Sequence, residues 1–195
     1  MNDTRNRLVN VTAVLFQRQG LAATGIKQIL SDSNAQFSSL YHHFPGGKEQ
    51  LAAEVIRASG IRYQELVEAV WDSAPDVLTG ITQVFEGAAE TLEATDFAVA
   101  CPIATVALEV ATTNEELRVV TAEVFSSWIS SGTDRLVAAG IDLTRARSLT
   151  LILVALLEGA FILCQAAKST ESMIAAGSAA VAIVSDALES SVADP

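Results

Sequence analysis

The sequence predicts an all-α protein of about nine helices, with a small N-terminal helix-turn-helix domain and a larger C-terminal helical domain. Half of the 195 residues are hydrophobic and only four are proline, a composition that favours long helices. Apolar residues recur at spacings of three and four along most of the chain. The charge is divided unevenly, because residues 1–49 carry a net charge of +2 and residues 50–195 one of −13. A basic head on an acidic body suits a polyanionic partner, and a merely acidic soluble protein is the alternative.

The N-terminal region is expected to form three short helices and the start of a fourth. Apolar residues mark a first amphipathic helix, which Gly20 stops. Thr24 is the candidate N-cap of the second helix. Asn34 lies in the turn that follows, and asparagine is the non-glycine residue best able to adopt a positive φ. A third helix is predicted over 37–44 and a fourth over 48–72.

Beyond Pro75 the helical pattern continues without an internal repeat or a flexible linker. A helix-turn-helix domain is therefore placed at 1–48 and a helical ligand-binding and dimerisation domain at 49–195. The further helices are predicted at 76–94, 102–112, 114–139, 144–168 and 171–192.

The predicted third helix carries side chains suited to a DNA groove. Leu40 and Phe44, four residues apart, anchor it to the first two helices. The remaining hydroxyl, imidazole and phenol groups can bond base edges and phosphates. Lysines near the starts of the second and fourth helices are placed for phosphates. The candidate DNA-binding residues are Lys27, Phe37, Ser38, Ser39, Tyr41, His42, His43 and Lys48.

Each of these residues also has a simpler interpretation. A short helix-turn-helix in an all-α protein is often only a hairpin of two helices. Tyr41 is then a packing residue with an exposed hydroxyl, and the two histidines are solvated surface groups. Phe37 could contact a thymine methyl, or it could fold back onto Leu40 and Phe44. Packing is the preferred alternative for Phe37.

The same region resembles the DNA-binding part of the TetR family of transcriptional repressors. The resemblance covers about residues 5–55 and rests on the helix opening at Thr24, the run SLYHHF at 39–44 and Lys48. The chain departs from the family pattern at Gly25, Asn34 and Phe37. The resemblance implies phosphate contacts for Lys27, Tyr41 and Lys48, and positions at or near base edges for Ser38, Ser39, His42 and His43.

Two further runs resemble the lincomycin- and flavonoid-responsive (LmrA/YxaF-like) branch of that family. They are PGGKEQL at 45–51 and CPIA at 101–104, the latter together with Glu109. The resemblance implies a dimer in which the last two helices of each chain form a four-helix bundle. It also implies a cavity for a small-molecule effector in the body.

The apolar segment Ser148–Ala167 approaches the length that spans a membrane. Glu158 lies at its middle, where a charge costs roughly 2.5–3.5 kcal/mol on insertion scales. Burial in a core or an oligomer interface is therefore preferred, and no membrane partner is expected.

A homodimer through helices near 144–168 and 171–192 would present two reading helices to a palindromic double-stranded operator. A monomer with an internal core is the alternative.

The effector is expected to be small and largely apolar, because aromatic residues with a few polar groups make a typical ligand cavity. Glu158 is assigned a structural partner instead of the ligand. The candidate ligand-binding residues are Phe85, Phe97, Cys101, Glu109, Phe125, Trp128, Phe161 and Gln165.

No catalytic residues, metal site or cofactor are predicted. The two histidines are adjacent, and no cysteine spacing suits a metal. The two cysteines are expected to be free thiols in a reducing cytoplasm. An enzyme using Glu109 or Glu158 as a base, and a helical adaptor or small-molecule binder that does not bind DNA, are the competing classes.

Overall fold

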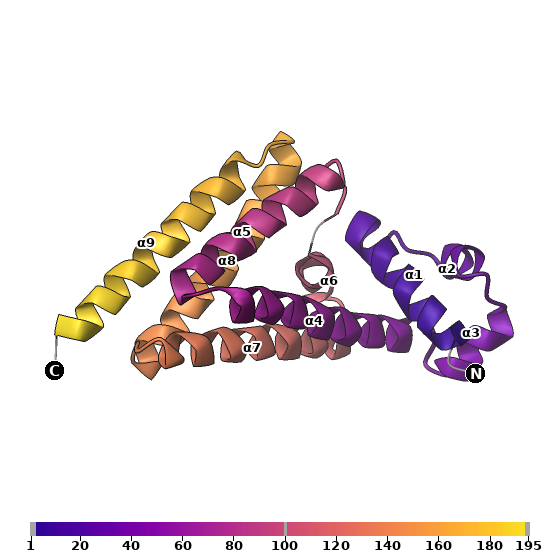
Figure 1. Cartoon of the computed structure of the whole chain (residues 1–195). Helices are drawn as coiled ribbons and strands as arrows, with labels where there is room; N and C mark the ends of the chain where they lie inside the picture. Colours follow the sequence, from indigo (N-terminus) through magenta and orange to yellow (C-terminus); the bar gives the residue numbers. More distant parts are fainter. Residues whose placement is uncertain (1–2, 100, 194–195) are drawn as a thin grey trace. The chain divides into compact units, whose positions relative to one another are not determined.

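The computed structural model describes residues 3–99 and 101–193, and within these ranges it contains nine α-helices and no strand (Figure 1). The predicted all-α class is confirmed. The predicted helices all form, with ends close to the predicted ones. They are α1 (Asp3–Gln19), α2 (Ile26–Asp32), α3 (Phe37–His43), α4 (Gly47–Ser73), α5 (Val77–Ala94), α6 (Pro102–Val110), α7 (Glu115–Ala138), α8 (Leu143–Ala167) and α9 (Glu171–Ala193).

The chain divides into two compact units. Unit 1 comprises residues 1–63 and 101–125, and unit 2 comprises residues 64–100 and 126–195. Helices α4 and α7 therefore contribute to both units. Unit 1 extends beyond the DNA-binding domain predicted at 1–48, because it also includes α6 and the first parts of α4 and α7.

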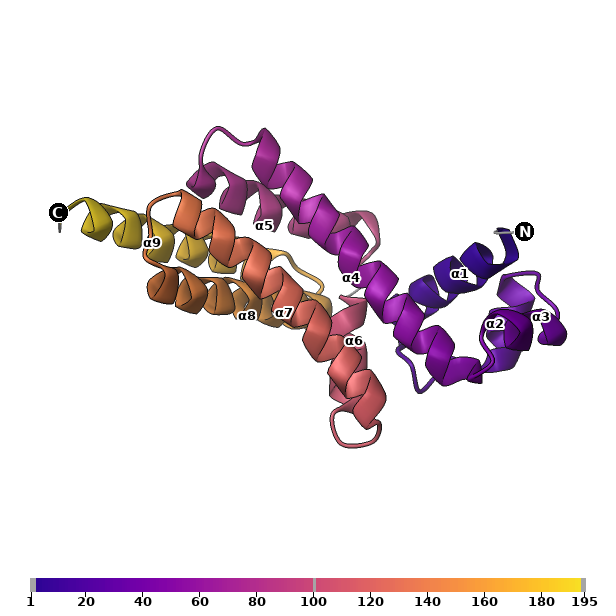
Figure 2. The ribbon, with the colours of Figure 1, turned by 90° about the horizontal axis from the view of Figure 1, so that it is seen from below.

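In unit 1, helix α1 packs against α2, α3 and α6 (Figure 2). Leu40 of α3 is 0% exposed and Phe44, which follows α3, is 1% exposed. Burying a side chain of this size contributes about 1.5–3 kcal/mol. These two residues fix α3 to the rest of the unit, as their spacing predicts. Other fully buried members of this core are Leu8, Phe16, Ile29, Leu51 and Ile56.

Of the two predictions for the ends of α2, the one for the turn after the helix is confirmed and the one for its N-cap is not. Asn34 has a φ of +48°, so the predicted left-handed residue is confirmed. The prediction that Thr24 caps α2 is wrong, because the N-cap is Gly25, which offers no side-chain acceptor. The Thr24 hydroxyl instead donates to the Gly20 carbonyl at 2.5 Å and is buried there. A hydroxyl turned back toward α1 cannot accept from the first N–H groups of α2.

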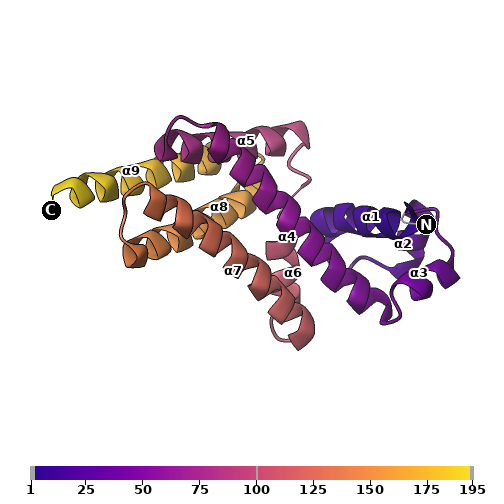
Figure 3. The same ribbon diagram turned by 60° about the horizontal axis from the view of Figure 1, so that its bottom comes forward.

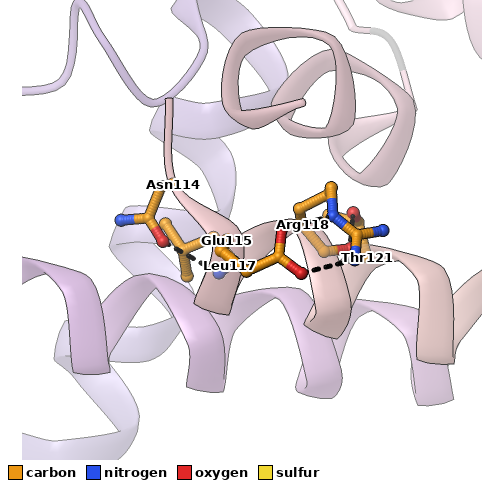
Figure 4. A network of polar contacts seen from close by, with 5 residues as sticks. All are labelled: Asn114, Glu115, Leu117, Arg118 and Thr121. Atoms are coloured by element: carbon orange, nitrogen blue, oxygen red, sulfur yellow. Dashed lines mark hydrogen bonds and ion pairs between the residues drawn. The ribbon is translucent and has the colours of Figure 1, made fainter. Parts of the chain in front are cut away.

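Polar side chains fix the first turn of α7 (Figure 4). The Asn114 side-chain oxygen accepts from the Leu117 N–H at 3.0 Å, and its amide donates to Glu49 of α4 at 2.9 Å. Arg118 and Glu115 form an ion pair at 2.6 Å, which lowers the pKa of Glu115. Asn114 thereby caps α7 and joins it to the first turn of α4.

In unit 2, helices α5, α8 and α9 pack side by side (Figure 1). Gly177 of α9 permits a close approach to α5, since a Cβ there would lie 2.9 Å from the Cβ of Phe85. The small residues of α9 thus serve packing inside the unit. The buried apolar core of these helices includes Ile81, Phe85, Leu92, Leu149, Leu153, Ala160, Met173 and Val184.

The parts of α4 and α7 that belong to unit 2 lie side by side and are joined by polar bonds (Figure 3). The Ser131 hydroxyl donates to Glu68 at 2.6 Å and lowers the pKa of that carboxyl. Arg135 forms an ion pair with Asp72 at 2.7 Å. These bonds are largely exposed and set the alignment of the two helices more than their stability.

Candidate nucleic-acid interface

Helix α3 presents one uninterrupted exposed face. Phe37, Ser38, Tyr41 and His42 are all exposed, and they occupy the stripe made by residues one and four apart on a helix. Ser39 and His43 flank this stripe and are half-buried, while Leu40 points inward. The structure therefore brings the six predicted α3 residues together on one surface. The helix carries no Asp or Glu, so nothing on this face repels a phosphate.

The expectation that Phe37 packs onto Leu40 and Phe44 is wrong. Phe37 is 62% exposed, and its ring centroid lies 4.9 Å from that of Tyr41. Residues seven apart share a face only while the helix continues. Phe44 lies beyond the end of α3 with φ −133° and ψ 77°, so its side chain leaves that face.

The Tyr41 ring is held from two sides. Phe37 stacks on it at an interplanar angle of 47°. Gly47, at φ +66°, lies near the ring, and a Cβ there would be in van der Waals contact with the Tyr41 ring carbon Cε1 at 3.4 Å. Tyr41 itself is 41% exposed, so its hydroxyl remains accessible. An aromatic ring fixed in this way is pre-organised for a ligand, because less side-chain entropy is lost on binding.

The two predicted phosphate-binding lysines differ in their surroundings. Lys27 is exposed on α2. Lys48 is half-buried, and its Nζ donates to the Leu21 carbonyl at 2.7 Å. Burial lowers the pKa of Lys48, and the nearby Glu109 carboxylate opposes that change. An ammonium group has three donors, so the bond to Leu21 leaves two of them for a phosphate. The phosphate contacts of both lysines stay predictions.

Glu109 of α6 holds the loop that follows α1. Its carboxylate accepts from the Leu21 N–H at 3.2 Å and from the Ala22 N–H at 2.6 Å. Gly20, at φ +75°, makes room for this, because a Cβ there would overlap the carboxylate. With Lys48 on the Leu21 carbonyl, the loop is bound by both α6 and α4. Sequence reasoning placed Glu109 in a ligand cavity and missed this contact, because 87 residues separate Glu109 from Ala22 and no local signal joins them.

The other predicted ligand-binding residues do not share one unit. Cys101, Glu109 and Phe125 belong to unit 1. In unit 2, Phe85 lies in the packed core, and the Gln165 amide donates to the Phe97 carbonyl at 3.2 Å. Their contact with an effector stays a prediction. The predicted ligand-binding residues of unit 2 are Phe85, Phe97, Trp128, Phe161 and Gln165.

Unit 2 has a surface concavity of about 460 Å³ near the turn between α7 and α8, and none of the predicted ligand-binding residues lines it. Polar side chains dominate its rim, so it lacks the apolar lining expected for the predicted effector. It is lined by Val137, Gly140, Ile141, Asp142, Arg145, Ser190 and Ser191.

Helix α8 exposes large apolar side chains over much of its length. By length and hydropathy alone, Leu143–Ala167 and Glu171–Ser191 are long and apolar enough to cross a membrane. Only 28% and 33% of their most apolar windows are buried inside the protein, so most of this apolar surface is not covered by the chain itself. Among the described residues of α8 and α9, the exposed large apolar side chains are Leu143, Leu151, Ile152, Ile162, Leu163 and Ile174. We call this set the apolar α8/α9 face. A surface of this kind marks an interaction site.

Comparison with known proteins identifies both parts of the chain. Residues 8–55 match the family described as bacterial regulatory proteins, tetR family. Residues 77–179 match the C-terminal domain of LmrA/YxaF-like transcriptional regulators. The HTH-type transcriptional regulator YxaF of Bacillus subtilis is 32% identical over 161 residues, which cover 83% of this chain and 84% of YxaF. LmrA of the same organism is 29% identical over 88% of this chain and 92% of LmrA.

Solved structures agree on the fold. A TetR-family regulator from Cytophaga hutchinsonii superimposes with a TM-score of 0.82 at 20% identity, covering 94% of each chain. One from Streptomyces coelicolor gives 0.78 at 19% identity, covering 95% of this chain and 97% of that one.

A helix-turn-helix with an exposed reading face, followed by a helical body, defines a DNA-binding transcriptional regulator. This chain belongs to the tetR family of bacterial regulatory proteins, in its LmrA/YxaF-like branch. The family consists of repressor-type regulators and not of enzymes, so the enzymatic alternative falls. Membership of this family also implies DNA binding, which argues against an adaptor or small-molecule binder that does not bind DNA.

Proposed function

We propose that the protein is a cytoplasmic, ligand-responsive repressor that binds a palindromic operator as a homodimer and is released by a small, largely apolar effector. The observation that carries the proposal is the exposed face of α3, where Ser38, Tyr41 and His42 lie together on a helix held by the buried Leu40. Hydroxyl and imidazole groups bond base edges and phosphates, and an α-helix fits the major groove.

The apolar α8/α9 face supports the homodimer. Exposing six large apolar side chains to water is unfavourable, and since each is about half exposed, completing its burial contributes on the order of 1 kcal/mol. A two-fold axis pairs this face with the same face of a second copy. A lipid bilayer fits this face less well than a second copy of the chain does. Glu158 lies at the middle of α8, and it is already half-buried with a partner in the protein.

A two-fold dimer determines the symmetry and the half-site spacing of the operator. The two α3 helices then enter successive major grooves about 34–36 Å apart, which selects an inverted repeat. Tyr41, Lys27 and Lys48 take phosphates in this arrangement, and Ser38, Ser39, His42 and His43 lie at or near base edges.

In the proposed release, the effector shifts the C-terminal helical domain between two conformations. Effector binding favours a position of α6 that weakens operator binding. The contacts of Glu109 with Leu21 and Ala22 support a route from α6 to the helix-turn-helix, because these contacts join the two within unit 1.

The test begins with purified full-length protein and a pool of random-sequence duplexes, from which bound DNA is selected and sequenced. We expect an inverted repeat, bound with an affinity that falls steeply with salt because lysines displace counterions from the phosphates. Fluorescence anisotropy from 50 to 200 mM salt measures this. If no duplex is enriched, or if the affinity does not depend on salt, the repressor proposal is wrong.

The effector part is tested separately on the selected duplex. Small apolar compounds are screened for a rise in the melting temperature of the protein, since a ligand of the native state stabilises it. A compound that stabilises the protein is then expected to release the duplex in the anisotropy assay. If compounds stabilise the protein but leave its affinity for the duplex unchanged, ligand-controlled release is wrong. The DNA-binding part of the proposal is not affected by that result.

A further inference from the structure

Phe37 opens α3 with its ring in solvent, although the buried core of unit 1 lies close by. The side chain is 62% exposed and sits on the same face as Ser38, Tyr41 and His42. A single exposed phenylalanine needs no explanation by itself. This one lies in the first turn of the helix whose N-terminal residues contact base edges in a helix-turn-helix complex.

The ring is also held in place. Its centroid lies 4.9 Å from that of Tyr41, with the two rings tilted by 47°. A fixed, exposed aromatic group can bury apolar area on binding with little loss of side-chain freedom. Phe37 therefore has the form of a recognition side chain, and its apolar ring excludes a hydrogen bond to a phosphate or to a polar base edge.

The major groove offers one apolar group to such a side chain. Adenine, guanine and cytosine present donors and acceptors there, whereas thymine also presents its C5-methyl group. We propose that Phe37 contacts the C5-methyl group of one thymine in each half-site of the operator and so makes that base pair a specificity determinant. This inference rests on the proposed operator binding and adds a base to it.

Deoxyuridine tests the contact, because it differs from thymidine only by that methyl group. Each thymine of the selected duplex is replaced by deoxyuridine, symmetrically in both half-sites, and the dissociation constant is measured by anisotropy. For the native protein we expect one position at which replacement weakens binding roughly fourfold per half-site, from the burial of one methyl group. Replacement elsewhere should have little effect.

The Phe37→Ala variant closes a double-mutant cycle with that replacement. It should bind the thymine duplex more weakly than the native protein and should no longer distinguish thymine from uracil at that position. Ser38→Ala is the matched control, since it changes the neighbouring exposed residue and should keep the distinction. Phe37→Leu should keep part of it, and circular dichroism checks that each variant folds.

Three outcomes would overturn the inference. They are a selected half-site without thymine, a native protein that tolerates every replacement, and an unchanged thymine preference in Phe37→Ala. The last outcome would mean that Phe37 only supports the Tyr41 ring. In all three the duplex is still bound, so the proposed function stands. If no duplex is bound at all, the proposed function fails and this inference falls with it.

Discussion

Helices α3 and α8 both place side chains in solvent, but of opposite kinds. Helix α3 spans seven residues and exposes mostly hydroxyl, imidazole and aromatic groups around one buried anchor, Leu40. Helix α8 spans 25 residues and exposes aliphatic side chains such as Ile152 and Leu163. A polar face has water as an acceptable partner until a more specific one binds, whereas an aliphatic face is better buried in any state. This difference supports the proposed roles of the two helices, which are reversible recognition for α3 and permanent assembly for α8.

The largest effect is expected where assembly is broken. Ile152→Glu combined with Leu163→Glu places two carboxylates in the proposed dimer interface, where burying unpaired charge is very unfavourable. We expect a monomer by sedimentation. Operator affinity should fall by about 10²–10⁴, because the second half-site is no longer bound by a linked partner.

The control for this variant is Leu66→Glu on α4. Leu66 is 59% exposed and Leu163 is 58% exposed, so Leu66→Glu removes about as much exposed apolar surface as Leu163→Glu alone. Leu66→Glu should leave the protein dimeric. If it dissociates the protein as well, or if the double variant stays dimeric, the apolar α8/α9 face is not the interface.

The next effect concerns recognition by α3. His42→Ala removes an exposed imidazole from the reading face and should weaken binding to the selected operator by roughly 0.5–1.5 kcal/mol per half-site, the value of one hydrogen bond. Binding to unrelated duplexes should hardly change. Anisotropy on the operator and on a scrambled duplex separates the two effects.

Lys27→Ala provides the contrast to His42→Ala. Without the ammonium group, a phosphate is no longer neutralised, so binding to both duplexes should weaken alike. The slope of log affinity against log salt should become shallower by about 0.9 for each such phosphate. Equal weakening on both duplexes for His42→Ala would show that His42 binds phosphate and not a base edge. An unchanged salt slope for Lys27→Ala would remove Lys27 from the interface.

The sequence determined the helices well and the contacts between them poorly. Leu40 and Phe44 could be assigned to the core because both are large and apolar and because they lie four residues apart. Phe37 could not be placed, because its spacing from Leu40 allowed packing and only the structure shows that its ring lies against Tyr41. The role of Thr24 depends on the Gly20 carbonyl, which only the folded turn brings near. Local periodicity reports burial, whereas a hydrogen bond depends on backbone geometry that composition does not encode.

Glu109 is the clearest contact that sequence could not supply, since 87 residues separate it from Ala22. Glu109→Gln keeps the shape of the side chain, removes its charge and replaces one of its two accepting oxygens with an NH2 group. Hydrogen bonds to a charged acceptor are stronger than those to a neutral one, so we expect a decrease of roughly 1 kcal/mol in the free energy of unfolding. Hydrogen exchange at the Leu21 and Ala22 amides should also become faster.

Glu116→Gln is the matched control for this change, because Glu116 is an exposed glutamate in the first turn of α7. It should leave the midpoint of chemical denaturation and the exchange of both amides nearly unchanged. Equal midpoints for the two variants would show that the Glu109 contacts contribute no stability to unit 1. Faster exchange without a change in midpoint would confine their effect to the loop that follows α1.

The smallest expected effect lies in the turn that positions α3. Asn34 has a φ of +48°, a conformation that is unfavourable by roughly 1–2 kcal/mol for an ordinary residue and that glycine adopts freely. Glycine also gains entropy in the unfolded chain, which offsets about 0.4–1 kcal/mol of that benefit. Asn34→Gly should therefore raise the free energy of unfolding by at most about 1 kcal/mol, and Asn34→Ala should lower it. Operator affinity should stay the same for the glycine variant, because the exposed face of α3 is not altered. A destabilised glycine variant would mean that the Asn34 side chain itself supports the turn, so that anchoring α3 depends on more than the burial of Leu40 and Phe44.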